Sequence, residues 1–109
     1  MLDYNEPRNQ LSKMRTEMVR AYESINPDKM RARIAELEKE QNADGFWNDT
    51  DNAKKVSREI SQLQGKIDKF EKMIARIDDA IDTVDIIELE GDETEDEKLL
   101  TTVHDLGEA

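Results

Sequence analysis

Apolar residues recur at steps of three and four, without a break, through the middle of the sequence. They occupy the a and d positions of successive heptads and are Ala53, Val56, Ile60, Leu63, Ile67, Phe70, Ile74, Ile77, Ile81 and Val84. Because more than four heptads follow this pattern, it predicts one long helix with a coiled-coil seam. We expect the helix to run from about Thr50 to Leu89, which is on the order of 60 Å at about 1.5 Å per residue.

The composition fits helices with narrow apolar seams better than a thick core. Of the 109 residues, 36% are hydrophobic and 39% are charged, whereas about a quarter of an ordinary domain is charged. A helix of the predicted length also exceeds the diameter of a compact domain of this size, about twice a radius of gyration of ~13 Å. We therefore expect an all-α, elongated antiparallel helical bundle or coiled coil of about four helices, with residues 1–109 forming a single domain.

Three shorter helices are predicted beside the long one. The first should run from about Asn5 to Ser24. The second should begin at Asn26-Pro27 and stop near Asn42, because Asn caps helices and Pro suits the first helical position. A turn at 91–93 and a capping box at 94–97 predict the fourth. The apolar residues of these helices are Leu11, Met14, Met18, Tyr22, Ile25, Met30, Ile34, Leu37, Leu99, Leu100, Val103 and Leu106.

The connector before the long helix, within DGFWNDTD, contains an adjacent aromatic pair in a chain that is only 5% aromatic. Gly45 suits a left-handed position after the preceding helix. We expect Phe46 and Trp47 to insert together as an apolar plug between the two helices, packed as a hydrophobic staple. Asn48 or Asp49 should cap the long helix. The alternative is an exposed aromatic hot spot for a partner, and the plug is the preferred interpretation.

The order of these features resembles a known family. IAELEKE, a short loop and then FWNDTDNAKKVSREISQLQGKID are similar to the N-terminal domain of the bacterial peptide chain release factor 2 family, one of the class I release factors. The resemblance covers essentially the whole chain and is most specific over residues 34–67. Thr50 departs from the Pro of many members. Neither the Gly-Gly-Gln motif of catalysis nor the Ser-Pro-Phe motif of decoding in this family occurs in the sequence.

The resemblance implies a non-catalytic helical domain in translation termination, without the decoding and catalytic domains. Such a domain would position the factor on the ribosome and contact the stalk base or the termination GTPase. A different hypothesis is a free-standing coiled-coil adaptor or chaperone-like module. That module would associate with itself through an exposed seam of the long helix.

Charge is distributed unevenly along the predicted long helix. Residues 78–97 contain eleven acids and no base, and acids near a helix C-terminus oppose its dipole. A solvated face is one interpretation and docking to a basic partner is the other. Lys54, Lys55 and Arg58, at the opposite end, are expected to pair with acids of the second helix rather than to touch ribosomal RNA. The candidate partner-contact residues are Asp78, Asp79, Asp82, Asp85, Glu88, Glu90, Asp92 and Glu93.

Several functions are disfavoured by composition. The net charge of −11 argues against independent nucleic-acid binding, because that affinity comes largely from Lys and Arg displacing counterions. The absence of cysteine excludes disulfides and thiolate zinc sites. His104 is the one histidine, without a Ser or Cys partner, so neither an enzyme nor a cofactor or metal is expected. With no apolar run of about 20 residues and no recognisable signal peptide, we expect a cytoplasmic protein.

Overall fold

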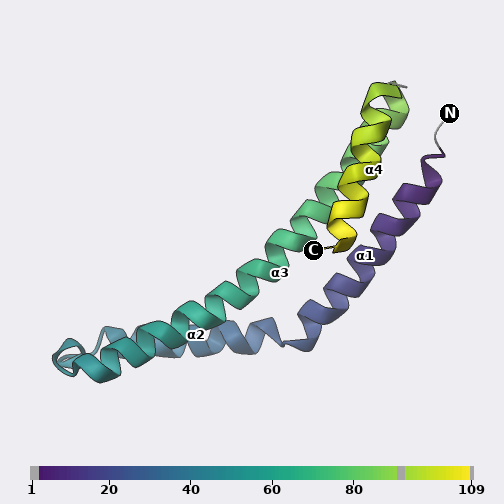
Figure 1. The fold of residues 1–109 in the computed structure, drawn as a ribbon. Helices are drawn as coiled ribbons and strands as arrows, with labels where there is room; N and C mark the ends of the chain where they lie inside the picture. The colour runs from purple at the N-terminus through teal and green to yellow at the C-terminus, as the bar shows by residue number, and fades with distance from the viewer. Residues whose placement is uncertain (1–2, 91–92, 109) are drawn as a thin grey trace. The chain divides into compact units, whose positions relative to one another are not determined.

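The computed structural model describes residues 3–90 and 93–108; for residues 93–96 it describes the backbone only. In these residues the chain forms four α-helices and no strand, which confirms the all-α prediction (Figure 1). The helices are α1 (Asn5–Ser24), α2 (Pro27–Gln41), α3 (Thr50–Glu90) and α4 (Glu93–Glu108), and a 3₁₀ turn, η1 (Phe46–Asn48), precedes α3. No helix in this part of the chain is long and apolar enough to cross a membrane.

The helix boundaries follow from local side-chain chemistry. Asn26 adopts a left-handed conformation with φ 55°, and its side-chain oxygen accepts a hydrogen bond of 3.4 Å from the Lys29 amide, as expected for an N-cap. Gly45 has φ 81° and supplies the predicted left-handed position. α4 begins at Glu93, one residue before the predicted cap at Thr94, and the capping box itself involves side chains at 94–96 that lie outside the described part of the chain. The turn predicted at Gly91 and Asp92 lies outside the described residues.

Two compact units share the long helix α3. Unit 2 is Tyr22–Glu71 and contains α2, η1 and the first part of α3. Leu37, Phe46, Ala53 and Val56 form its buried core, with Ile60 and Leu63 packed against them. Unit 1 contains α1 up to Ala21, α3 from Lys72 and α4. Its core residues come from all three helices and are Leu11, Ile77, Ala80, Val84, Ile87, Leu99, Val103 and Leu106.

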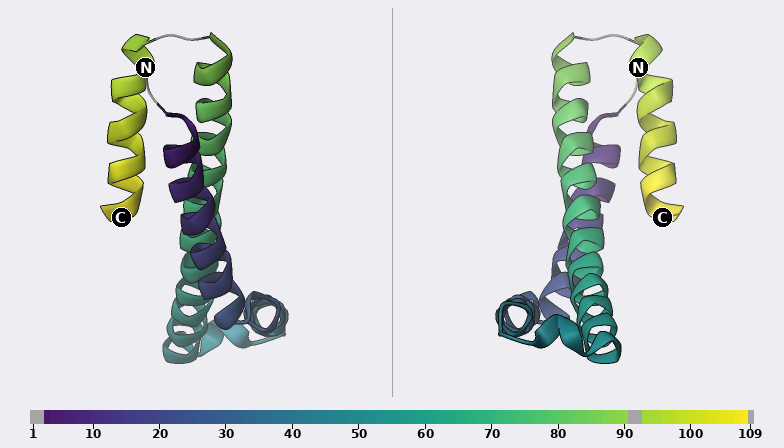
Figure 2. Two further views of the ribbon diagram at one scale, coloured as in Figure 1. Left: turned by 90° about the vertical axis from the view of Figure 1, so that its right-hand side faces the viewer. Right: turned by 90° about the vertical axis from the view of Figure 1, so that its left-hand side faces the viewer.

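Within each unit the helices run antiparallel. In unit 2, Arg31 pairs with Glu71 near the start of α2, and Gln41 contacts Ser57 near its end. In unit 1, α1 crosses α3 in the same opposed sense, with early residues of one contacting late residues of the other. Figure 2 shows α4 running back along the C-terminal part of α3. The antiparallel arrangement predicted from the sequence is therefore confirmed within both units.

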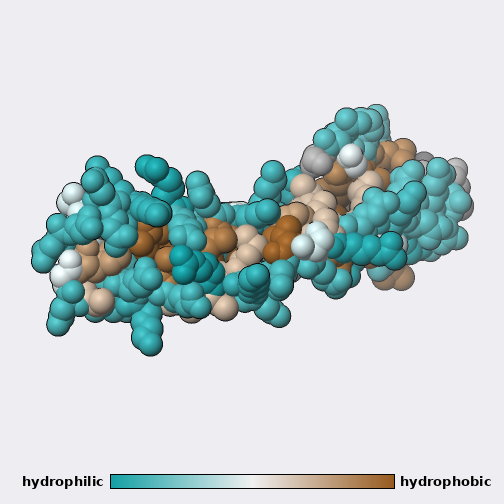
Figure 3. Space-filling model, turned by 90° about the horizontal axis from the view of Figure 1, so that it is seen from below, coloured by the Kyte–Doolittle hydropathy of each residue, from teal (hydrophilic) through white to brown (hydrophobic). Residues whose placement is uncertain are grey.

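The predicted seam of α3 faces the chain's own helices. Five of its ten residues are buried and the other five are half-buried, and the seam extends to Ala80 and Ile87. The helix is continuous past Ile77, as expected. In the space-filling view, hydrophobic residues are visible between hydrophilic ones (Figure 3). On α4, Leu100 is 50% exposed, because Leu99, Val103 and Leu106 occupy the inward positions.

A polar cluster joins the end of α1 to α2 and α3 within unit 2. The Tyr22 hydroxyl donates to Glu71 at 2.9 Å and accepts from Arg31 at 2.8 Å. The Tyr22 ring lies 5.8 Å from that of Phe70. Desolvation, followed by the hydrogen bond to Glu71, raises the pKa of Tyr22. Within unit 2 the cluster therefore joins Tyr22 to the start of α2 and to α3 through one aromatic contact and a network of hydrogen bonds.

Gly45 and Gly65 should respond in opposite ways to the same substitution. A Cβ at Gly65, inside α3, would meet nothing within 4 Å, so Gly65→Ala should raise the free energy of unfolding by about 0.5–1 kcal/mol through helix propensity. Gly45→Ala should lower it, because φ 81° strains any L side chain. Urea denaturation followed by circular dichroism measures both. A loss of stability in Gly65→Ala would contradict an open environment at that position.

Candidate functional site

Three of the eight acids predicted to contact a partner are engaged within the chain. Arg15 Nε donates to Asp78 Oδ1 at 2.6 Å, and Arg8 Nη2 donates to Asp85 Oδ1 at 3.0 Å. Arg8 also pairs with Glu88. These bonds raise the pKa of both arginines, through Glu88 and then Asp85 for Arg8, and through Asp78 for Arg15. The three carboxylates therefore hold α1 against α3 in unit 1.

The acids on the outer side of α3 are different. Asp79, Asp82 and Glu90 are exposed, and none forms an ion pair with any other described residue. Ile86 and Leu89 lie among them and are 53% and 87% exposed. Asp82, Ile86 and Leu89 are spaced by four and three, so they share one face of the helix. We call Asp79, Asp82, Ile86, Leu89 and Glu90 the outer acidic surface.

Two predicted acids cannot be assigned to this surface. Asp92 lies outside the described residues, and Glu93 is described only as the first residue of α4. The apolar members were missed by sequence reasoning, which attended to the charges. A signal was available, because Ile86 and Leu89 fall outside the heptad steps that continue from Val84 to Ile87. An exposed Leu flanked by unpaired carboxylates is a feature of contact surfaces rather than of packing.

The aromatic connector separates the two rings that were expected to act together. Phe46 is 8% exposed and packs in the core of unit 2, as predicted. Trp47 is 61% exposed, so its predicted burial is wrong. Successive residues of a 3₁₀ turn point about 120° apart, and Phe46 takes the inward direction. The Trp47 ring rests edge-on against Phe46, with centroids 4.9 Å apart and planes at 85°.

Capping at the start of α3 is carried by one of the two expected residues. Asp49 Oδ1 accepts a hydrogen bond of 3.1 Å from the Asn52 amide, which confirms it as the cap. Asn48 instead is the last residue of η1, and its backbone N–H donates to the Gly45 carbonyl oxygen at 3.1 Å. The connector is thus fixed by backbone hydrogen bonds and by Phe46, while Trp47 is presented to solvent.

The predicted pairing of Lys54, Lys55 and Arg58 with acids of α2 is wrong. No ion pair of these three cations is present in the described part of the chain. The sense of pairing is reversed: Arg33 of α2 donates to Glu59 of α3 at 3.1 Å and pairs with Glu36 at 3.2 Å. Glu59 lies beside α2, where it meets Arg33. Lys55 precedes Glu59 by four residues and shares its flank of α3, whereas Lys54 and Arg58 lie on the side of the helix opposite the seam. The side chains of all three cations are exposed.

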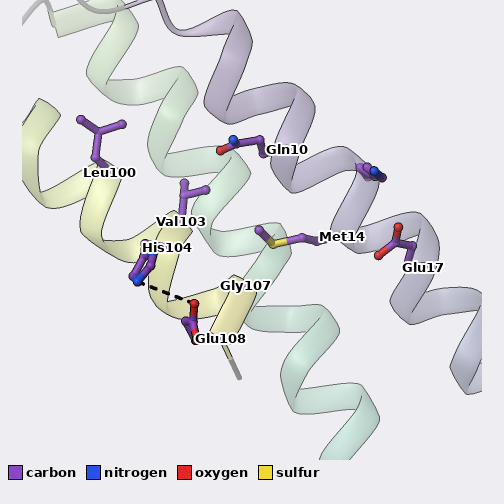
Figure 4. A pocket seen from close by; sticks show the side chains of 9 residues that line it. Gln10, Met14, Glu17, Leu100, Val103, His104, Gly107 and Glu108 are labelled. Carbon is purple, nitrogen blue, oxygen red and sulfur yellow. Dashed lines mark ion pairs between the residues drawn. The ribbon is translucent and has the colours of Figure 1, made fainter.

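An open groove of about 470 Å³ lies between α1 and α4 in unit 1 (Figure 4). Met14, Leu100 and Val103 contribute its apolar part, and Glu17 and Glu108 contribute charge at its rim. His104 is exposed there, with Nε2 3.8 Å from Glu108 Oε1. Sequence reasoning missed the groove because it arises between helices distant in the sequence. It forms where α4 directs Leu99, Val103 and Leu106 into the core and leaves Leu100 outside.

The chain resembles known proteins over most of its length. The family model described as the PCRF domain matches residues 30–108. Peptide chain release factor 2 of Corynebacterium aurimucosum is 34% identical over 85 residues, which is 78% of this chain and 23% of that protein. The protein of the same name from an Exiguobacterium species is 31% identical over 98 residues, covering 90% of this chain and 27% of that protein.

A third relative shows stronger identity over a shorter region. Peptide chain release factor 2 of Borreliella burgdorferi is 42% identical over 65 residues, which is 60% of this chain and 18% of that protein. The chain therefore spans about a quarter of the length of the curated relatives it matches. No solved structure matches it significantly.

The two aromatic residues of the connector should differ sharply in their contribution to stability. Phe46→Ala removes a buried ring and should lower the free energy of unfolding by about 3–5 kcal/mol. Trp47→Ala removes an exposed ring that contacts Phe46 and should lower it by less than about 1.5 kcal/mol. Urea denaturation measures both variants. The emission maximum of Trp47 should change little on unfolding, and a blue-shifted native maximum would contradict its exposure.

Proposed function

The chain belongs to the PCRF domain family, and from this membership we propose that it acts in translation termination as a helical, non-catalytic part of a release factor. The family model and the names of the relatives support the proposal. The sequence contains neither the Gly-Gly-Gln nor the Ser-Pro-Phe motif, which agrees with a part that neither hydrolyses nor decodes. Its work is to position the factor on the ribosome through contact with partners.

The outer acidic surface is the observation that best supports partner contact. Asp79, Asp82 and Glu90 have no ion-pair partner among the described residues, so their charge is available to an outside group. Ile86 and Leu89 add apolar area that folding leaves exposed. A complementary partner presents Lys or Arg around an apolar patch. The stalk base of the ribosome and the termination GTPase are the partners we propose for it.

Self-association as an adaptor module is the second candidate. The seam of α3 offers little for it, because the seam is buried or half-buried against the chain's own helices. Ile86 and Leu89 are the exposed residues that favour it. Sedimentation of the free chain distinguishes the two candidates. A monomer at concentrations that saturate partner binding excludes the adaptor.

Reversing the charge of the outer acidic surface should weaken partner binding without altering the fold. The triple variant Asp79→Lys, Asp82→Lys and Glu90→Lys leaves the Arg8 and Arg15 pairs intact. We expect binding to salt-washed ribosomes, or to the purified termination GTPase, to fall by about tenfold at low salt, since three exposed pairs of about 0.2–1 kcal/mol each are lost. The difference should shrink as salt rises from about 0.1 to 1 M and the Debye length shortens.

A matched control separates a local effect from one of net charge. Glu23→Lys, Glu38→Lys and Glu40→Lys changes the net charge by the same amount at exposed positions of unit 2 and should bind like the unmodified chain. A second variant, Ile86→Ser with Leu89→Ser, should weaken binding at all salt concentrations. Equal binding by all of these proteins across the salt series would refute the outer acidic surface as the contact.

A further inference from the structure

Five cations gather on the solvent side of α3 within unit 2. Lys54, Arg58 and Lys69 belong to one row with Gln62 and Gly65, spaced by four, four, three and four residues, so they follow one side of the helix. Lys55 and Lys66 flank this row, and all five cations are exposed. We call these five residues, with Gln62 and Gly65 between them, the basic row. It spans about 22 Å along the helix at about 1.5 Å per residue.

The cations of the basic row have no internal partners. None forms an ion pair within the described residues, whereas Arg8, Arg15, Arg31 and Arg33 all do. Their nearest helical neighbours are cations as well: Arg58 follows Lys54 by four residues and Lys55 by three, and Lys69 follows Lys66 by three. Like charges at these spacings destabilise a helix. Folding alone therefore does not explain why the cations are grouped in a chain with 27 acids.

Gly65 is a second unusual feature of this side of α3. It lies inside a long helix, where glycine is unfavourable, and a Cβ at this position would meet nothing within 4 Å. No contact within the chain therefore requires a glycine. A helix position without a side chain allows a ligand backbone to approach closely. Between Arg58 and Lys69, the surface of the row is therefore recessed at Gly65, which has no side chain, and it carries a cation on either side.

We propose that the basic row binds the phosphate backbone of RNA. Lys and Arg neutralise phosphates and release their counterions, and the gap at Gly65 admits the sugar–phosphate chain between two cationic ends. The choice of RNA over another polyanion rests on the proposed function in translation termination. The net charge of −11 is the reason why the sequence alone argues against nucleic-acid binding. At the basic row its effect is reduced, because exposed charges farther away than about 8 Å are largely screened at physiological salt.

The acids nearest the basic row cancel only part of its charge. Glu59 and Glu71 are paired with Arg33 and Arg31 of α2. Asp68 accepts a hydrogen bond from the neutral amide of Gln64 at 2.9 Å and keeps its charge. Asp51, at the start of α3, is the other nearby acid without an ion pair among the described residues. Five cations therefore face solvent beside two such carboxylates, and the local charge is positive.

An acidic protein is the competing occupant, and the composition of the row disfavours it. Protein interfaces are built around buried apolar and aromatic anchors. Every residue of the basic row is a cation, an amide or a glycine, so it offers no such anchor. Contacts with nucleic acid are more polar and more positively charged than those with protein. The row therefore matches a phosphate backbone better.

Charge reversal tests the site directly in the full chain. A fluorescently labelled RNA hairpin is titrated by anisotropy over a salt series with the triple variant Lys54→Glu, Arg58→Glu and Lys69→Glu. We expect a loss of at least about tenfold in affinity and a salt slope shallower by about one for each cation removed. The matched control Lys13→Glu, Arg20→Glu and Lys29→Glu has the same net charge and should bind within about twofold of the unmodified chain. Circular dichroism verifies that both variants remain helical.

A neutral substitution tests the close approach. Gly65→Gln fills the gap without changing charge, and we expect weaker RNA binding by several fold with helicity equal or higher. A purely structural role of Gly65 would give unchanged binding. That result would overturn the assigned approach of the backbone.

Other outcomes decide the identity of the ligand. No salt-dependent binding of the hairpin, or equal loss in the triple variant and its control, overturns the proposal. Tighter binding of polyglutamate than of the hairpin would assign the row to an acidic protein. Equal binding of a DNA duplex of the same sequence would overturn the assignment to RNA. The variant Asp79→Lys, Asp82→Lys and Glu90→Lys should retain RNA binding, so this proposal and the proposed partner contact fail separately.

Discussion

The unbroken apolar seam of α3 is the constraint on which the structure depends. A helix of 41 residues with one apolar side cannot bury that side by itself. In unit 2 the seam is covered by α2 together with Phe46, and in unit 1 it is covered by α1 and α4. The other helices are short and only moderately apolar. Packing on α3 supplies the stability that short helices lack in isolation.

The seam also sorts the charges. Arginines of α1 and α2 reach acids that flank the seam, where Arg15 meets Asp78 and Arg33 meets Glu59. Exposed pairs of this kind contribute little energy individually. Their effect is to fix how each short helix lies along α3 and to neutralise the acids nearest the seam. Asp79, Asp82 and Glu90, on the outer side of α3, have no such partner among the described residues and face solvent.

The chain therefore presents one acidic and one basic surface, although its net charge is −11. The outer acidic surface of unit 1 combines carboxylates with Ile86 and Leu89, while the basic row of unit 2 is wholly polar and centred on Gly65. Both surfaces belong to a chain of the PCRF domain family, for which we propose a part in translation termination. An apolar-acidic surface and a basic-polar surface suit chemically different partners. The exposed Trp47 shows that unit 2 presents aromatic area as well.

The sequence by itself determined the helices. The heptad steps from Ala53 to Val84, the Asn26-Pro27 start and the Asp49 cap are local patterns, because helix period and end chemistry depend on residues within a few positions. The family resemblance rested on equally local phrases. Tertiary structure decided which flank each charge occupies. Whether Asp85 is paired and Asp82 free depends on the helix beside it, and whether Trp47 is buried depends on Phe46 taking the inward direction of a 3₁₀ turn. Such outcomes require contacts between distant residues, and a period read along one helix contains no information about them.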